Sequence, residues 1–269
     1  WFTAANFLQY GNALRVVRTD ASSARNATAN GAGLKINNDT DYENNYAGGQ
    51  ASVGNWGAKF PGTEGNALAV SICANATAFE QNLADSNQTV GEDAAGSTVI
   101  AVDAGTAFSV GDIISFSSAD ASSDATAFAH LAGDEGNQYE VTAISTNNLT
   151  VRLLDNPNGG GLKTALTAAT NVRRRWKFYD QVDAAPGTST WATGKNVTND
   201  EIHVVVYDTA GAITGYDGDV AGGRASSVIE IYSFLSQASD AKTSQGGTNY
   251  YVSVINNTSA YVRWGLHAS

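Results

Sequence analysis

The feature that most constrains the fold of this chain is a series of four short β-like runs in its middle third. Apolar and β-branched residues alternate partially within each run, and Gly, Asn, Asp and Ser separate one run from the next. Even spacing of this kind is typical of a small antiparallel barrel or sandwich, with the later runs forming a meander. We therefore predict a small β-domain at residues 89–177, built from the runs at residues 96–105, 110–118, 139–145 and 148–155.

The segments on either side of this middle part alternate helical and strand patterns. Residues 202–208 (IHVVVYD) form the clearest buried strand, because they are apolar nearly throughout and lie between turn residues. Residues 248–257 place two tyrosines, a valine and an isoleucine on one helical face, with Thr248 as the candidate N-cap. We further expect a helix at residues 3–10 with Thr3 as its N-cap, and strands at residues 13–19, 67–73 and 259–264. Residues 20–55 should be mostly loop, with a short strand at 34–37. Residues 226–238 should form a strand that runs into a short helix.

The expected fold class is therefore α+β. A discontinuous domain at residues 1–88 and 178–269 carries an inserted antiparallel β-barrel or β-sandwich domain at residues 89–177. The chain contains no methionine, and its first residues from Trp1 onward resemble the middle of an element, so we expect it to be part of a longer protein.

Charge and composition exclude two classes of partner. In a chain of 269 residues, 26 acidic side chains against 15 basic ones give a net charge of −11. This excess opposes non-specific binding of nucleic acids, which depends on Lys and Arg neutralising phosphates. No apolar run approaches the ~20 residues that span a bilayer, so we expect neither a nucleic acid nor a membrane as partner. The single cysteine, Cys73, lies in the apolar run ALAVSICA, and we expect a small buried side chain rather than a nucleophile.

The sequence carries no recognisable catalytic pattern. It has no G-x-S-x-G elbow, no P-loop and no dinucleotide-binding glycine motif after a strand. The histidines are far apart in sequence, and the acidic clusters lie in turn-like stretches where we expect solvated carboxylates. We therefore assign no catalytic, cofactor-binding or metal-binding residue, and we predict that the protein is not an enzyme and needs no cofactor. The residues weighed for such roles are His130, His203, His267, Asp39, Asp41, Glu43, Asp134, Glu135, Asp217 and Asp219.

One basic cluster, Arg173, Arg174 and Arg175, precedes Trp176. A patch of this kind with a neighbouring aromatic residue suits an anion or a single-stranded nucleic acid. Because the whole chain is acidic, we favour the alternative that the three arginines meet acidic neighbours on this subunit or on another one.

Four segments, in order along the chain, closely resemble the tail sheath proteins of contractile phages of the T4-like myovirus family. They are WFTAANFLQYGNALRVVR, NWGAKFPGTEGNALAVSIC, the pair APGTSTWA and NDEIHVVVYDTAGAITG, and YSFLSQASDAKTSQGGTNYYVSVINNTSAYV. Together they cover most of residues 1–75 and 178–264. The segment at 89–177 matches only as a β-rich insertion at the expected place.

The resemblance implies a structural protein of the virion. Sheath subunits stack as hexameric rings and form a helical sheath around the tail tube. Contraction of the sheath drives genome delivery into the host. The main partners of this chain would then be other copies of itself, and the sheath would assemble in the host cytoplasm. Contacts with the tail tube and the baseplate would lie outside this chain. The family has no catalytic residues that could be transferred to this sequence.

Other functional classes remain open at this stage. The inserted β-domain suits a carbohydrate-binding or adhesin module on a virion surface, with Trp176 or Tyr139 stacking on a sugar. A hydrolase would have to use the loop carboxylates Asp39, Asp41, Asp217 and Asp219. The sheath of a related contractile bacteriocin or secretion system is a neighbouring alternative. The loop ASDAKTSQGGT is the segment to test for contacts with another subunit.

Overall fold

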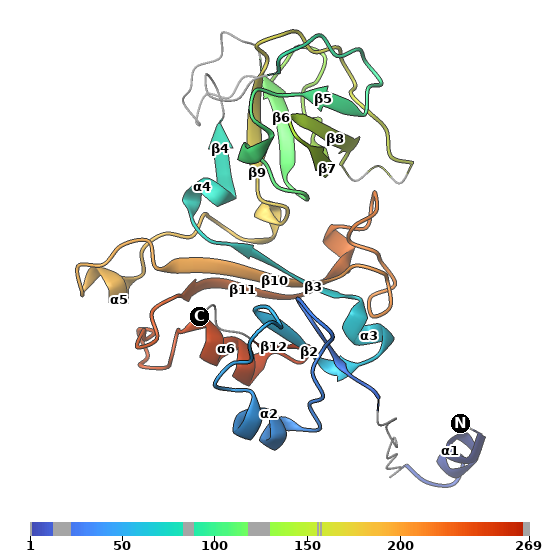
Figure 1. Cartoon of the computed structure of the whole chain (residues 1–269), viewed down its shortest axis with the longest axis vertical. Helices are drawn as coiled ribbons and strands as arrows, with labels where there is room; N and C mark the ends of the chain where they lie inside the picture. The colour runs from blue at the N-terminus through green and yellow to red at the C-terminus, as the bar shows by residue number, and fades with distance from the viewer. Residues whose placement is uncertain are drawn as a thin grey trace.

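The computed structural model describes residues 2–12, 23–82, 89–117, 130–154, 156 and 158–265. A six-stranded sheet lies at one end of the elongated molecule, and two three-stranded sheets with most of the helices lie towards the other end (Figure 1). The helices are α1 (Phe2–Leu8), α2 (Asp39–Asn45), α3 (Thr63–Asn66), α4 (Ala76–Phe79), α5 (Thr190–Thr193) and α6 (Tyr251–Thr258), with 3-10 turns at Gly105–Ala107, Tyr179–Gln181 and Ala225–Ser227. The strands are β1 (Asn26–Thr28), β2 (Trp56–Pro61), β3 (Leu68–Cys73), β4 (Glu80–Asn82), β5 (Val99–Ala101), β6 (Ile113–Ser117), β7 (Tyr139–Ser145), β8 (Asn148–Leu153), β9 (Asn171–Arg175), β10 (Glu201–Asp208), β11 (Val228–Ser236) and β12 (Val262–Trp264).

This mixture of helices and antiparallel sheets confirms the predicted α+β class. Among the described helices, none is long and apolar enough to cross a membrane.

The middle of the chain forms the six-stranded sheet, in the order β4-β9-β6-β7-β8-β5. The four runs seen in the sequence supply β5, β6, β7 and β8. The pairing of β6 with β7 and of β7 with β8 confirms the predicted meander. Alternate residues of these strands point to one side and build an apolar core, because side chains in a strand alternate between its two faces. That core includes Ile100, Ile114, Phe116, Tyr139, Val141, Leu149, Val151 and Val172.

The six-stranded sheet does not close into the barrel that the sequence suggested. β4 and β5 stay at its two edges, and each is only three residues long. Thr89 forms one bridge with Val102, accepts a backbone hydrogen bond from Ala169 and donates one to Thr170, and Val90 donates one to Ala101. These contacts involve only two residues, which are too few to make a closing strand. Closure requires a continuous ladder between the first and last strands, and such short edges cannot supply it.

The two smaller sheets share a core with α6. Their orders are β11-β10-β3 and β1-β2-β12. One face of β10, with Val204 and Val206, packs against Ile255 of α6 and the tryptophans Trp56 and Trp264. The opposite face packs against the aromatic residues that connect to the six-stranded sheet. As predicted, β10 is therefore buried on both faces, which explains its nearly continuous apolar sequence.

Several local predictions were confirmed. Helices form at α1 and α6, and strands form at β3 and β12. Two predicted N-caps were wrong: Thr3 lies inside α1, and Tyr250 is the N-cap of α6 without a side-chain cap bond. The strand predicted at residues 13–19 lies outside the described residues.

Other local predictions were wrong. Residues 226–238 do not turn into a helix, because β11 stays paired with β10 as far as Ser236. Residues 34–37 form only an isolated bridge, between Leu34 and Asn26. The acidic stretch DTDYE belongs to α2, whose N-cap Asn38 accepts a hydrogen bond from the Asp41 backbone. Residues 55–66, for which no regular element was expected, are mostly taken up by β2 and α3.

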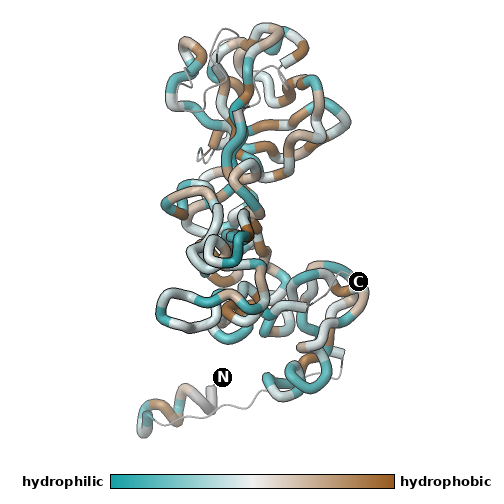
Figure 2. Tube along the Cα trace, turned by 90° about the vertical axis from the view of Figure 1, so that its left-hand side faces the viewer, coloured by the Kyte–Doolittle hydropathy of each residue, from teal (hydrophilic) through white to brown (hydrophobic). Residues whose placement is uncertain are grey.

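The division into domains at residues 1–88 plus 178–269 and at residues 89–177 stays a prediction. β4 belongs to the six-stranded sheet although it precedes residue 89. The chain enters that sheet at β4 and leaves it after β9, and Figure 2 shows a narrow, hydrophilic neck in this region.

Replacement of Ile255 by alanine is expected to lower the free energy of unfolding by about 2–5 kcal/mol, because its side chain is fully buried between α6 and the sheet around β10. Ile231→Ala in β11 is the matched control. Its side chain is 42% exposed, so we expect a loss of about 1 kcal/mol or less. Urea unfolding followed by circular dichroism measures both variants, and equal losses would contradict the packing of α6 described above.

Candidate functional site

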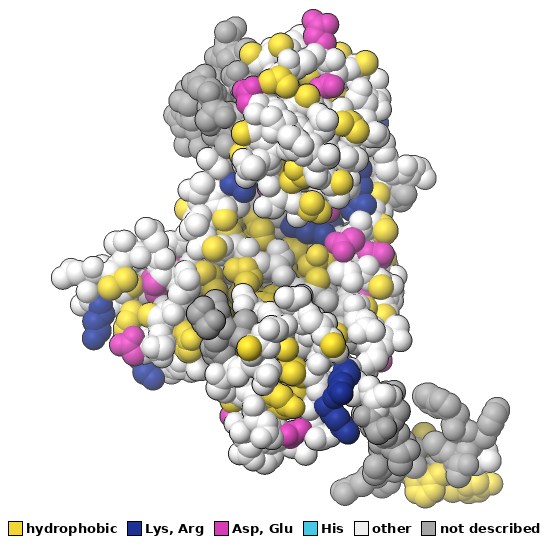
Figure 3. All heavy atoms as spheres, viewed as in Figure 1, with side chains coloured by type: hydrophobic (Ala, Val, Ile, Leu, Met, Phe, Trp, Pro, Cys, Tyr) yellow, Lys and Arg dark blue, Asp and Glu magenta, His cyan; other side chains and the backbone are white. Residues whose placement is uncertain are grey.

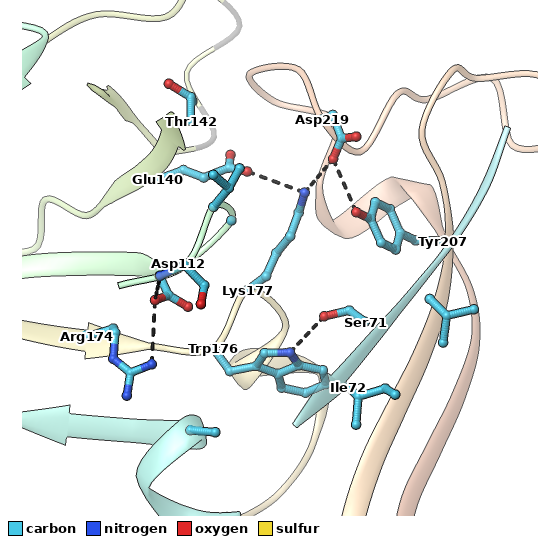
Figure 4. Close-up of a pocket in the computed structure, with 15 residues that line it drawn as sticks. Ser71, Ile72, Asp112, Glu140, Thr142, Arg174, Trp176, Lys177, Tyr207 and Asp219 are labelled. Atoms are coloured by element: carbon cyan, nitrogen blue, oxygen red, sulfur yellow. Dashed lines mark hydrogen bonds and ion pairs between the residues drawn. The ribbon is translucent and has the colours of Figure 1, made fainter. Parts of the chain in front are cut away.

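The described surface has a cleft at the junction between the six-stranded sheet and the sheet around β10. Its volume is about 510 Å³, and it is lined by residues from both sheets and from the loop after β10. Ser71 and Ile72 come from β3, Asp112 directly precedes β6, Glu140 lies in β7, and Asp219 lies in the loop at residues 209–227 (Figure 4). Figure 3 shows hydrophobic side chains gathered in the hollow between the six-stranded sheet and the part of the molecule that contains the two smaller sheets, with charged side chains at the right of this hollow.

The arginine run forms one wall of this junction as part of β9. Because side chains alternate along a strand, Arg173 and Arg175 share one face and Arg174 takes the other. Glu80 of β4 forms ion pairs with Arg173 at 3.7 Å and with Arg175 at 2.8 Å. Arg174 lies 3.6 Å from Asp112 and donates to Gln81 and to the Thr77 carbonyl. The interpretation that the arginines meet acidic neighbours is therefore confirmed, and these neighbours belong to the same chain.

Lys177 is the central charge of the junction. Its Nζ atom lies 2.7 Å from Asp219 Oδ1 and 3.4 Å from Glu140 Oε1. Glu140 also accepts from Arg152 at 2.6 Å, and the Lys177 ammonium lies 4.8 Å from the centre of the Tyr207 ring. Through these two acids, Lys177 joins β7 to the loop after β10. Its side chain is only 8% exposed, so the ion pairs lie in an environment with little water.

Asp112 and Trp176, which line the cleft, each have a polar partner. Burial raises the pKa of Asp112, against the opposing effects of the Ser109 N–H and of Arg174. Trp176 Nε1 donates to Ser71 Oγ at 2.8 Å and so ties β9 to β3. These contacts make the site a fixed connection between two sheets, since each charge already has a partner of opposite sign.

The proposed sugar-stacking residues are wrong on this structure, because both are buried. Trp176 packs edge-on against Phe178 and is tilted against His203. Tyr139 lies in the core of the six-stranded sheet, where its hydroxyl donates to Asp134 Oδ1 at 2.5 Å. A sugar ring stacks on an exposed aromatic face, and neither residue offers one.

His203 has the structural role expected of it. Its Nδ1 accepts from the Phe234 backbone N–H at 3.0 Å, so Nε2 carries the proton and donates to the Ala184 carbonyl at 2.8 Å. Phe234 has a positive φ of 56° at an irregularity in the β10–β11 ladder, and this hydrogen bond satisfies its amide. Burial lowers the pKa of His203 and outweighs the opposing hydrogen bond of Ala184, which favours the neutral ring.

The other residues weighed from the sequence are scattered over the molecule. Asp39 pairs with Arg263, and Asp41 accepts from the Asn37 backbone beside α2. His130 bridges Ser117 in the six-stranded sheet. His267 lies outside the described residues. Of the histidines and acidic residues weighed from the sequence and described in the structure, only Asp219 lines the junction cleft. The backbone N–H of Asp219 donates a hydrogen bond to the Asp217 carboxylate. Burial raises the pKa of the Cys73 thiol to about 12, as expected of an inert side chain.

No catalytic or metal arrangement emerges from these positions. Within the part of the chain that the structure describes, three or more His, Cys, Asp or Glu side chains do not come together in a way that could hold a metal ion. The sequence did not indicate the roles of Lys177 and Glu140. Lys177 comes directly after RRRW, but nothing local in the sequence links it to acids at positions 140 and 219.

The loop that carries Asp219 is held by another buried carboxylate, Asp208, at the end of β10. Asp208 accepts hydrogen bonds from the backbone N–H groups of Ala210, Ala212, Ile213 and Thr214 at 2.7–3.2 Å. Burial raises the pKa of Asp208, but these hydrogen bonds together outweigh it and hold the pKa below its ordinary value. One side chain thus fixes the start of the loop at residues 209–227.

Among curated proteins, the chain is similar to a tail sheath protein of Salmonella phage ViI, with 28% identity over 267 residues. The match covers 96% of this chain but 38% of the relative, so the chain spans well under half the length of that relative. No family model and no solved structure matches the chain.

Removal of the central charge should weaken the junction. We expect Lys177→Met to lower the free energy of unfolding by about 3 kcal/mol, because Glu140 would stay buried with Arg152 as its remaining partner. Lys163→Met, which changes an exposed lysine, is the control and should change stability by about 0.5 kcal/mol or less. Denaturant unfolding at pH 7 measures both; a Lys177 variant as stable as wild type would show that the ion pairs do not stabilise the junction.

The role of Asp208 predicts a pH dependence with a definite sign. A carboxyl group with a lowered native pKa stabilises the fold above about pH 4, and this contribution is lost as the pH falls through the native pKa. Asp208→Asn should therefore cost about 1–3 kcal/mol at pH 7, and the difference from wild type should shrink towards pH 2. Asp240→Asn, at an exposed position, serves as the control. A difference that stays constant from pH 7 to pH 2 would argue against this role.

Proposed function

We propose that this chain is part of a structural subunit of a contractile phage tail sheath. In this proposal, copies of the full-length protein form hexameric rings that stack into a helical tube around the tail tube. Contraction of the tube delivers the genome into the host. The protein assembles in the host cytoplasm and then resides in the virion.

The observation that carries the proposal is the extent of the similarity to the Salmonella phage ViI tail sheath protein. The aligned region covers 96% of this chain, so it includes the inserted sheet as well as the flanking parts. The sequence motifs that resemble sheath proteins lie in residues 1–75 and 178–264. The alignment therefore adds support from residues 89–177, which these motifs do not cover.

The physical character of the molecule supports the same role. A contracting sheath needs subunits that keep their shape while contacts between them exchange. In this chain a buried core in each part and ion pairs at the junction favour such a fixed shape. The tube-binding and baseplate-binding parts are proposed to lie outside this chain.

The proposal is tested by electron microscopy of the full-length protein that contains this chain. We expect purified protein to form hollow tubes with a six-fold symmetric cross-section, as a self-assembling sheath should. Full-length protein that stays monomeric across salt and protein concentrations, and that antibodies fail to locate on phage tails, would overturn the proposal.

The same preparation separates the neighbouring alternative of a bacteriocin or secretion-system sheath. Particles isolated from the producing cells should carry DNA-filled heads if the tube belongs to a phage. Headless contractile particles, or tubes anchored in the cell envelope, would assign the sheath to one of the other contractile systems.

A further inference from the structure

We propose that the chain contacts a second copy of itself head to tail, with the tip at residues 190–199 of one copy docking into the junction cleft of the next. This inference rests on the proposed function, because it names surfaces through which sheath subunits would meet. Three observations carry it: the fixed shape of the tip, the chemistry of the cleft mouth, and the placement of both at opposite ends of β10.

The tip is a projecting but well-fixed part of the chain (Figure 1). Its short helix, α5, is capped by Ser189, whose Oγ accepts from the Ala192 N–H. Asp200 accepts from the backbone N–H and the Oγ of Ser189, both at 2.8 Å, and from Ser236 Oγ at 2.5 Å. These bonds anchor both ends of the tip to the sheet around β10. Such a preordered surface loses little conformational entropy when it binds.

The tip presents an apolar side chain beside a cation. Val197 is 47% exposed, and Lys195 is the single charged residue among residues 190–199. The Lys195 ammonium lies 5.8 Å from the centre of the Trp191 ring, so the exposed surface combines aliphatic, aromatic and positively charged groups. This combination suits a partner surface with an apolar floor and an acidic edge.

The cleft at the junction offers such a surface. Val110 at its mouth is 65% exposed, and the partly exposed Ile72 lies in its floor. The Asp219 side chain is 53% exposed, whereas its partner Lys177 is buried, so the charge that faces solvent at this edge is negative. Only Oδ1 of Asp219 takes part in the bonds to Lys177 and Tyr207. An incoming lysine can therefore approach the other carboxylate oxygen.

The two surfaces lie at opposite ends of the same strand. The tip leads directly into the start of β10 at Glu201, and the loop with Asp219 follows its end at Asp208. A contact between two different surfaces is heterologous, so each copy keeps one surface free for a further copy. Such a contact generates rings or helices instead of a closed two-fold dimer, which is the geometry that a sheath requires.

Disulfide trapping between copies tests this contact on the full-length protein. Val197→Cys and Val110→Cys are made as separate proteins, mixed before assembly and oxidised mildly. We expect a disulfide between the two variants at a yield at least tenfold above that of Val197→Cys mixed with Val99→Cys. Val99 is the matched control, because it is a similarly exposed valine on β5 that does not line the cleft. The native Cys73 gives little background, since it is fully buried.

A charge variant tests the electrostatic part of the contact. Lys195→Glu places an acidic group against Asp219, so we expect it to lower the yield of the trapped pair about tenfold. Lys163→Glu makes the same charge change at an exposed position outside both surfaces and should leave the yield unchanged.

The outcomes distinguish this contact from the proposed function. Tubes in the microscope without selective trapping would overturn the head-to-tail contact and leave the sheath function standing. Selective trapping without tubes would support the contact and count against the sheath function. Disulfides mainly between two Val197→Cys copies would reveal a two-fold contact and would also overturn the inference.

Discussion

The burial of β10 on both faces is the constraint on which the rest of this structure depends. One face completes the core with α6 and the two tryptophans, and the other packs on the aromatic residues that lead to the six-stranded sheet. Loss of either layer would expose a strand that is apolar nearly throughout, at a cost of about 25 cal/mol for each Å² of apolar surface. The core around α6 and the aromatic layer beneath the six-stranded sheet therefore both depend on this strand.

Buried carboxylates fix the loops at the two ends of β10. Asp200 holds the tip before the strand, and Asp208 holds the loop after it. Each accepts several hydrogen bonds, which compensates for the cost of removing a charge from water. The surfaces that we assign to contacts between copies are thus set at a defined distance from each other by one rigid strand.

The junction between the sheets is built differently from the cores on either side. Lys177, Glu140 and Asp219 form a chain of opposite charges, and the arginines of β9 add pairs with Glu80 and Asp112. Buried ion pairs contribute little net stability, because desolvation offsets much of their attraction, but a mispaired arrangement leaves a buried charge without a partner. Such a network favours one relative orientation of the two parts over others.

The sequence by itself determined the regular elements whose pattern is strictly local. The four β-like runs predicted β5 to β8, the apolar run at residues 202–208 predicted β10, and the spacing of apolar residues predicted α6. It also indicated a buried Cys73, a structural His203, and arginines paired with acids in an acidic chain. Each of these follows from periodicity or charge balance, which neighbouring residues are enough to define.

Only the tertiary structure decided the remainder, because it depends on residues that are distant in the chain. β9 is a strand because β4 and β6 lie on either side of it, and β11 remains a strand throughout because β10 pairs with it. The ion pairs of Lys177 join positions 140, 177 and 219, a combination that no local pattern encodes. The open sheet, the buried positions of Trp176 and Tyr139, and the cleft likewise arise from packing between elements.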